Sequence, residues 1–171
     1  EQLISQIAER LWRNGEQGII LGWLKKFPEN HEKSDPRLCA ILALIVFLAG
    51  GYDSAEAYIN KAEQNIVHLD DARFKGVIAA IRSYIADYRG RIEEVFQYGN
   101  IALSTLTGTY AIWRSLAGMA LGDAYTQKGP LIPATKSYKE AISGVEQLQG
   151  IITVLRLPSI VWLSCTTAVG I

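Results

Sequence analysis

The sequence predicts an all-α protein built from helix-turn-helix repeats, and three observations support this fold class. Apolar residues recur near a period of 3.6 along most of the 171 residues, which is the period of an amphipathic helix. No alternating apolar and polar run with hairpin turns is present, and the β-branched run at 151–157 has no partner strand. Glycines follow apolar helical stretches at 15, 50, 90 and 129, at spacings of 35, 40 and 39.

Helix start and stop signals mark the individual elements. Asp35-Pro36 predicts a helix start because Asp caps well and Pro suits the first helical position. Gly50-Gly51 predicts a helix end, and Asp53 with Glu56 resembles a capping box for the next helix. We expect about nine helices, over 2–13, 16–27, 36–49, 53–67, 71–89, 91–106, 110–128, 131–148 and 158–169.

Alignment on the four glycines brings similar residues together at fixed distances. Five residues after each glycine stand Ile20, Ala55, Val95 and Ala134; nine after stand Leu24, Ile59, Gly99 and Tyr138; twelve after stand Phe27, Ala62, Ala102 and Ala141. Small residues at a fixed position are typical of helices that approach closely. The pattern indicates repeats of tetratricopeptide (TPR) type, lengthened to about 39–40 residues and stacked as a right-handed α-α superhelix.

The repeats predict one domain over 1–171, with units at about 1–34, 36–69, 71–108 and 110–148 and a half-repeat at 151–171. The alternative is an ordinary antiparallel bundle with coincidental glycines. The chain begins without Met, so we expect a fragment of a longer protein. Charged residues become sparse after residue 108, and this apolar C-terminal end suggests self-association or a covering segment.

Composition narrows the functional classes. Seventeen basic and seventeen acidic residues balance, which argues against binding of nucleic acid by this segment. The longest apolar run, 38–49, is too short to span a membrane. We expect a cytoplasmic protein with no membrane association.

Catalytic and metal-binding patterns are scarce. His31 and His68 stand apart from other ligand residues, and Cys39 and Cys165 have no pattern typical of a nucleophile or a zinc site. There is no phosphate-binding glycine motif. We therefore expect no enzymatic activity, no metal site and no cofactor in this segment.

Solenoid geometry predicts a ligand-binding concave face lined by the first helix of each pair. The candidate residues on this face are Arg37, Phe47, Tyr84, Asp87, Tyr88, Met119, Asp123 and Gln127. They combine aromatic rings with hydrogen-bonding groups, which suit a small molecule or a peptide. The alternative for each aromatic residue is packing between neighbouring repeats.

Residues 8–64 resemble one known family. The matching features are Leu11-Trp12, Gly15, Trp23-Leu24, Phe27-Pro28, Pro36-Arg37-Leu38-Cys39, Leu48-Ala49-Gly50, Ala55 and Ala62-Glu63. They resemble the helical-repeat region of the MalT-like, LuxR-class ATP-dependent transcriptional regulators. Beyond residue 70 the likeness is only to generic repeats.

The resemblance implies a sensor domain that binds an inducer or a regulatory protein. It places ATP only in an upstream domain and DNA binding only in a downstream helix-turn-helix domain, both outside this sequence. The alternative is a TPR-type protein-interaction scaffold with no link to transcription.

Overall fold

The computed structural model describes residues 35–66 and 71–146, together with residues 10, 16, 18, 19 and 22. The residues described in 35–66 and 71–146 form six α-helices and one short 3₁₀-helix, and the described residues include no β-strand. The elements are α3 (Pro36–Leu48), α4 (Tyr52–Asn65), α5 (Ala72–Tyr88), α6 (Ile92–Thr105), η2 (Gly108–Tyr110), α7 (Ala111–Lys128) and α8 (Leu131–Glu146). The all-α prediction is confirmed for this part of the chain.

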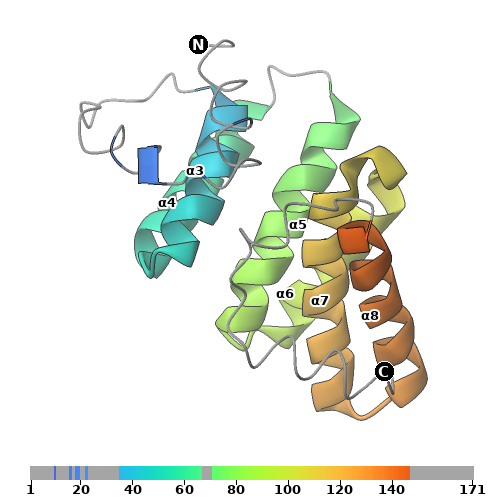
Figure 1. The fold of residues 1–171 in the computed structure, drawn as a ribbon. Helices are drawn as coiled ribbons and strands as arrows, with labels where there is room; N and C mark the ends of the chain where they lie inside the picture. Colours follow the sequence, from blue (N-terminus) through green and yellow to red (C-terminus); the bar gives the residue numbers. More distant parts are fainter. Residues whose placement is uncertain are drawn as a thin grey trace.

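The helices pack in consecutive pairs, and the pairs contact one another in chain order (Figure 1). α3 packs with α4, α5 with α6, and α7 with α8; α5 also contacts α3, α4 and α7, and α7 also contacts α6. Each of these six helices begins and ends within two residues of its predicted bounds. Apart from residues 10, 16, 18, 19 and 22, the remaining predicted helices at 2–13, 16–27 and 158–169 and the β-branched run at 151–157 lie outside the described residues, so the number nine is not confirmed.

Local sequence signals explain the helix ends. The Asp35 side chain accepts a hydrogen bond from the Arg37 backbone N–H at 2.9 Å, and Pro36 occupies the first turn of α3. At the other end of α3, Gly50 adopts a φ of 88°, which strongly favours glycine. The Gly51 N–H then bonds back to the Val46 carbonyl at 2.9 Å. This closure satisfies a carbonyl that the helix end would otherwise leave open.

The turn after α7 closes differently because a proline follows its glycine. Gly129 has a φ of 101°, and its N–H donates to the Tyr125 carbonyl at 2.9 Å. Pro130 has no N–H and so cannot form the second closing bond seen at Gly51. The predicted turn glycines at 50, 90 and 129 all have positive φ.

The predicted capping box at the start of α4 is wrong. α4 begins at Tyr52 behind Gly51, and no side chain caps its first N–H groups. Asp53 lies within the first turn and bonds Arg89 instead, while Glu56 bonds Arg89 and Arg91. These acids therefore connect α4 to the next helix pair.

The positions aligned by sequence are buried at equivalent places in successive pairs. Ala55, Val95 and Ala134 are buried, as are the small residues twelve positions after each turn glycine, Ala62, Ala102 and Ala141. At the position nine residues after the turn glycines at 90 and 129, the residue and the neighbour that it faces are complementary in size. A Cβ at Gly99 would lie 2.6 Å from Leu121 Cγ, so the Leu121 side chain already fills that space. The ring of Tyr138 likewise occupies the space that a side chain at Gly122 would need.

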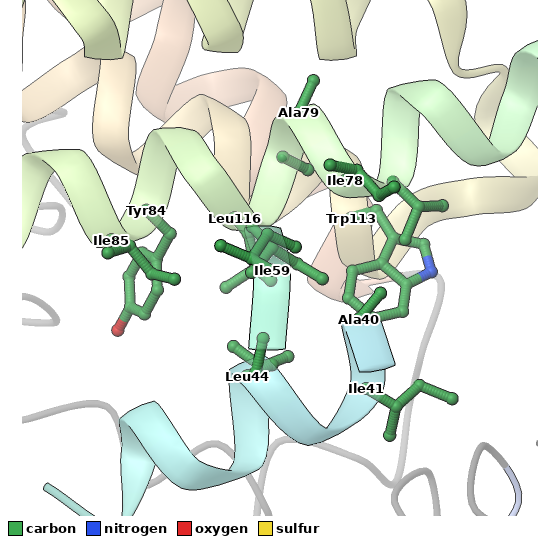
Figure 2. Packing of buried hydrophobic residues seen from close by; sticks show 14 of the residues in the cluster. Ala40, Ile41, Leu44, Ile59, Ile78, Ala79, Tyr84, Ile85, Trp113 and Leu116 are labelled. Atoms are coloured by element: carbon green, nitrogen blue, oxygen red, sulfur yellow. The ribbon is translucent and has the colours of Figure 1, made fainter. Parts of the chain in front are cut away.

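A continuous apolar core joins the three pairs (Figure 2). Leu44 from α3, Ile59 from α4, Ile78 and Ile85 from α5, and Leu116 from α7 all contribute to it. Trp113 is buried in this core, and Cys39 is buried as a small apolar residue. No helix in the described part combines the length and apolar character needed to cross a bilayer.

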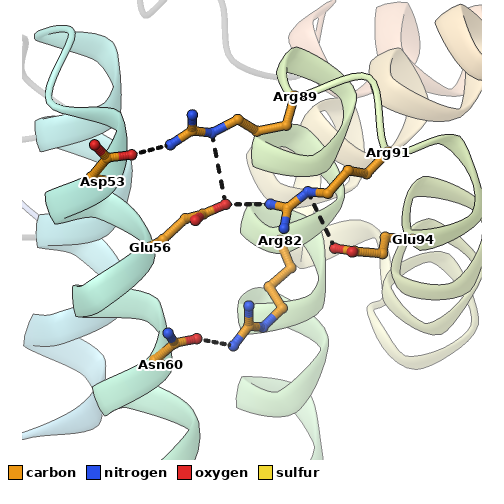
Figure 3. Close-up of polar contacts among 7 residues, drawn as sticks. All are labelled: Asp53, Glu56, Asn60, Arg82, Arg89, Arg91 and Glu94. Atoms are coloured by element: carbon orange, nitrogen blue, oxygen red, sulfur yellow. Dashed lines mark hydrogen bonds and ion pairs between the residues drawn. The ribbon is translucent and has the colours of Figure 1, made fainter.

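A row of polar contacts connects α4 to the second pair (Figure 3). The Arg82 guanidinium bonds both carboxylate oxygens of Glu63 and lies 2.7 Å from Asn60 Oδ1. Arg89 bonds Asp53 at 2.5 Å, and Arg91 bonds Glu56. Most of these pairs are solvent-exposed, and exposed pairs contribute only about 0–1 kcal/mol each. They set the alignment of α4 on α5 more than they stabilise the fold.

Candidate functional site

Several polar and aromatic residues meet near the C-terminal ends of α3, α5 and α7. Tyr84, Asp87 and Tyr88 occupy one face of the last turns of α5, because residues three and four apart share a helix face. Phe47 comes from the last turn of α3, and Asp123 from the last two turns of α7. We name these five residues, with Tyr52 and Tyr138, the tyrosine–aspartate cluster.

The aromatic part of the cluster surrounds Phe47, which is 5% exposed. Its ring centroid lies 5.3 Å from that of Tyr52, 5.5 Å from that of Tyr84 and 5.3 Å from that of Tyr88, all in edge-on geometry. Tyr52 and Tyr88 stack at 4.4 Å, and the Tyr88 hydroxyl bonds the Tyr52 hydroxyl at 2.7 Å. Edge-on and offset aromatic pairs are favourable geometries. The rings therefore tie the first helix pair to the second.

The acidic part of the cluster lies between α5 and α7. Asp87 hydrogen-bonds Asp123 through its side chain, and the Tyr138 hydroxyl on α8 donates to Asp123 Oδ1 at 2.5 Å. Neither carboxyl group forms an ion pair with a basic residue in the described part of the chain. Two adjacent carboxyl groups without a cation disfavour double ionisation.

Burial raises the pKa of Asp87 to about 7, and the charge of Asp123 and the hydrogen bond to it act in the same direction. Burial also raises the pKa of Asp123, while hydrogen bonds from Tyr138 and Asp87 oppose that change. Both acids lie near helix C-terminal ends, where the helix dipole disfavours negative charge. Asp87 therefore carries the proton of this pair near neutral pH, and Asp123 accepts the hydrogen bond from it.

Tyr84 connects the aromatic and acidic parts. Its ring contacts Phe47, and its hydroxyl forms no hydrogen bond within the described residues although Tyr84 is only 9% exposed. Burial raises the pKa of Tyr84 to about 12, with further increases from the charges of Asp87 and Asp123. Figure 2 shows this hydroxyl pointing away from the core residues Leu116 and Trp113. A buried hydroxyl without a partner is unusual because it lacks the hydrogen bond that offsets desolvation.

Three of the predicted site residues, Arg37, Met119 and Gln127, are not part of the cluster. Arg37 stands at the opposite end of α3, where its guanidinium is 3.6 Å from Asp71. Met119 is 5% exposed and packs in the apolar core. Gln127 is exposed on the last turn of α7.

Five of the eight predicted residues thus come together: Phe47, Tyr84, Asp87, Tyr88 and Asp123. Sequence reasoning missed Tyr52 and Tyr138 as members of this group. Tyr138 was identified only as a packing position nine residues after Gly129, and only the fold shows that its hydroxyl reaches Asp123. Tyr52 directly follows the Gly50-Gly51 turn, and that position is the one signal for its closeness to the end of α3.

The donor set does not favour a metal ion. Within the described residues no group of three or more His, Cys, Asp or Glu side chains could hold one. His31, His68 and Cys165 lie outside the described ranges. Hard cations such as Ca²⁺ take six to eight oxygen ligands, which two carboxyl groups and two phenols do not supply.

Comparisons of the chain with protein-family models, with curated proteins and with solved structures find no match.

Proposed function

We propose that the chain is a TPR-like helical-repeat domain that binds a ligand or partner through the tyrosine–aspartate cluster. The observation that carries this proposal is the convergence of aromatic and acidic side chains from the first helices of three successive pairs. Packing of the apolar core accounts for Phe47 and Tyr84, but it does not account for the acidic pair Asp87 and Asp123, which is not part of that core. A half-buried acidic pair reduces stability, and groups of this kind concentrate at functional sites.

The repeat architecture is supported by the recurrence of the same contacts. Each first helix packs on its own second helix, and α3, α5 and α7 contact one another in order. The turn glycines with positive φ are separated by 40 and 39 residues. A stack of such units is the basis of α-α superhelices, whose inner face presents first-helix residues to a ligand.

The resemblance of residues 8–64 to LuxR-class regulators supports a more specific function. We propose that the domain senses an inducer or a regulatory protein for a transcriptional activator of this class. A ligand with higher affinity for one conformation of the full regulator would shift its population toward that conformation. The differential affinity would reside in this domain, while ATP and DNA would bind elsewhere in the regulator.

A thermal-shift screen tests the binding proposal. The chain is heated with sugars, amines and short peptides, and we expect at least one class to raise the melting temperature, because ligands that bind the folded state stabilise it. Tyr88→Ala should abolish this shift, since Tyr88 is 57% exposed and presents its ring to a ligand. Ile132→Ala on α8, also an exposed apolar residue, is the matched control and should retain it. No stabilising ligand, or an equal shift in Tyr88→Ala, contradicts the proposal.

The neighbouring sequence of the same gene product separates the two classes of function. A phosphate-binding loop upstream and a helix-turn-helix motif downstream would support the regulator. Absence of both would assign the same binding face to an interaction scaffold.

A further inference from the structure

The chemistry of the tyrosine–aspartate cluster indicates the kind of group that it binds, provided that it is the binding site proposed above. The side chains of Asp87 and Asp123 lie against each other with no basic partner among the described residues. Tyr84 is nine-tenths buried as a residue, the charges of both carboxyl groups act on it, and its hydroxyl has no hydrogen-bond partner among the described residues. Three oxygen groups are therefore available to one donor-rich cation.

We propose that this site binds the protonated primary amino group of an organic amine. An alkylammonium has three N–H donors, which match the oxygens of Tyr84, Asp87 and Asp123 in number. Its positive charge removes the repulsion between the two carboxylates. The apolar part of the amine then lies against the ring of Tyr88, which is exposed beside Asp87.

The aromatic rings add a second attraction for a cation. Tyr52 and Tyr88 form a stacked pair at 4.4 Å whose outer faces are electron-rich. A cation held within about 6 Å of such a ring is attracted to its face. One such cation–π contact is already present in the fold, where Arg89 Cζ lies 5.9 Å from the Tyr52 ring centroid.

Binding of the amine must displace the proton that the acidic pair holds. The ammonium enters as R–NH₃⁺, Asp87 loses its proton to solvent, and both carboxylates end ionised against the cation. Asp87 faces Asp123 on α7 and Tyr84 on its own helix, and Tyr138 of α8 reaches the pair through Asp123. The facing residue of α3 is Phe47, which does not titrate.

The nearest basic residues in sequence do not neutralise this pair. Arg89 bonds Asp53 and Glu56, and Arg91 at the start of α6 bonds Glu56 and Glu94. Because the pKa of Asp87 is raised to about 7, affinity for the amine should fall as pH decreases below neutrality. The expected decrease from about pH 8 to about pH 6 is about tenfold.

Isothermal titration calorimetry tests the proposal with 2-phenylethylamine and its neutral analogue 2-phenylethanol. We expect the amine to bind the chain at least tenfold more tightly than the alcohol at about pH 8. Titrations in two buffers of different ionisation enthalpy should show close to one proton released at about pH 6 and almost none at about pH 8. Equal affinities, or an affinity unchanged between these pH values, would overturn the proposal.

Variants locate the binding. Asp87→Asn and Tyr84→Phe should each weaken amine binding about tenfold or more, while Glu93→Gln, which removes an exposed carboxylate on α6, should not change it. Circular dichroism confirms that each variant is folded, and Asp87→Asn relieves repulsion and so should remain folded. Unchanged affinity in Asp87→Asn would refute the assignment.

A peptide with one lysine, and the same peptide with norleucine in its place, identify the source of the amino group. Lysine-dependent binding that is lost in Asp87→Asn assigns the site to a peptide; binding of 2-phenylethylamine alone assigns it to a small amine. If neither amine binds, but a sugar or a neutral peptide raises the melting temperature of the chain and not that of Tyr88→Ala, the amine inference fails and the proposed function remains.

Discussion

Replacement of Asp87 by asparagine should stabilise the protein, and more at alkaline than at acid pH. Asparagine has nearly the shape of a protonated aspartic acid and can donate a hydrogen bond to Asp123, as Asp87 does. It carries no charge at any pH. The variant therefore keeps the contact between α5 and α7 and removes the burial of a carboxylate beside another carboxylate.

The sign and size of the effect follow from the pKa of Asp87. Folding raises that pKa from 3.8 to about 7, so the folded chain binds a proton that the unfolded chain has already lost. The stability that this proton supports is fully present below about pH 3.8 and is lost as pH rises toward 7. At about 1.36 kcal/mol for each pKa unit, the loss is roughly 4 kcal/mol. Solvent screening of the partly exposed carboxyl reduces this to about 2 kcal/mol.

Urea unfolding followed by circular dichroism measures this difference. We expect Asp87→Asn to be about 2 kcal/mol more stable than the wild type at about pH 8, and less than about 1 kcal/mol more stable at about pH 5. Glu93→Gln is the control, because loss of its exposed pair with Lys128 should change stability by less than about 1 kcal/mol. An Asp87→Asn variant that is no more stable than the wild type at about pH 8, or equally stabilised at both pH values, would refute the reasoning.

Three further predictions concern packing. Ala55→Trp should destabilise by more than the usual overpacking cost of about 1–3 kcal/mol because Ala55 is fully buried, whereas Ala57→Trp on the exposed side of α4 should leave the melting temperature nearly unchanged. Gly118→Ala should lower the melting temperature, since its Cβ would lie 2.9 Å from a backbone oxygen of α8. Gly108→Ala has open space and should be neutral in the same melt. Arg114→Met should cost about 1–3 kcal/mol in urea unfolding because it leaves the carboxylate of Glu140 and two α6-end carbonyls without their donor, and Arg114→Lys should recover only part of that.

The helix boundaries were predictable because they depend on local chemistry. Asp35-Pro36 starts α3 by capping and by fixing φ, and the glycine at 50 ends it by adopting a conformation that other residues avoid. The capping box at Asp53 was mispredicted for a related reason. A local motif indicated a cap at Asp53, but α4 begins at Tyr52, so Asp53 lies within the first turn and its side chain bonds Arg89, 36 residues away.

The candidate site was predictable only in part. Helical spacing placed Tyr84, Asp87 and Tyr88 on one face of α5, and solenoid geometry added Asp123 from the first helix of the next pair. The same geometry also selected Met119, which the structure buries in the core, and Arg37, which lies at the far end of α3. Repeat geometry predicts which face of a helix a residue shares, but it does not predict how deeply neighbouring helices bury that residue.

The sequence alone therefore determined that this chain forms helices, where each of the six described helices begins and ends, and which small residues lie at the joints between them. These features depend on interactions within a few residues, and such interactions can be read from the order of side chains. Only the tertiary structure decided that Asp87 meets Asp123, that Tyr138 donates a hydrogen bond to Asp123, and that the buried Tyr84 hydroxyl has no hydrogen-bond partner among the described residues. Those contacts depend on the spacing of three helices, which the packing of the whole core sets.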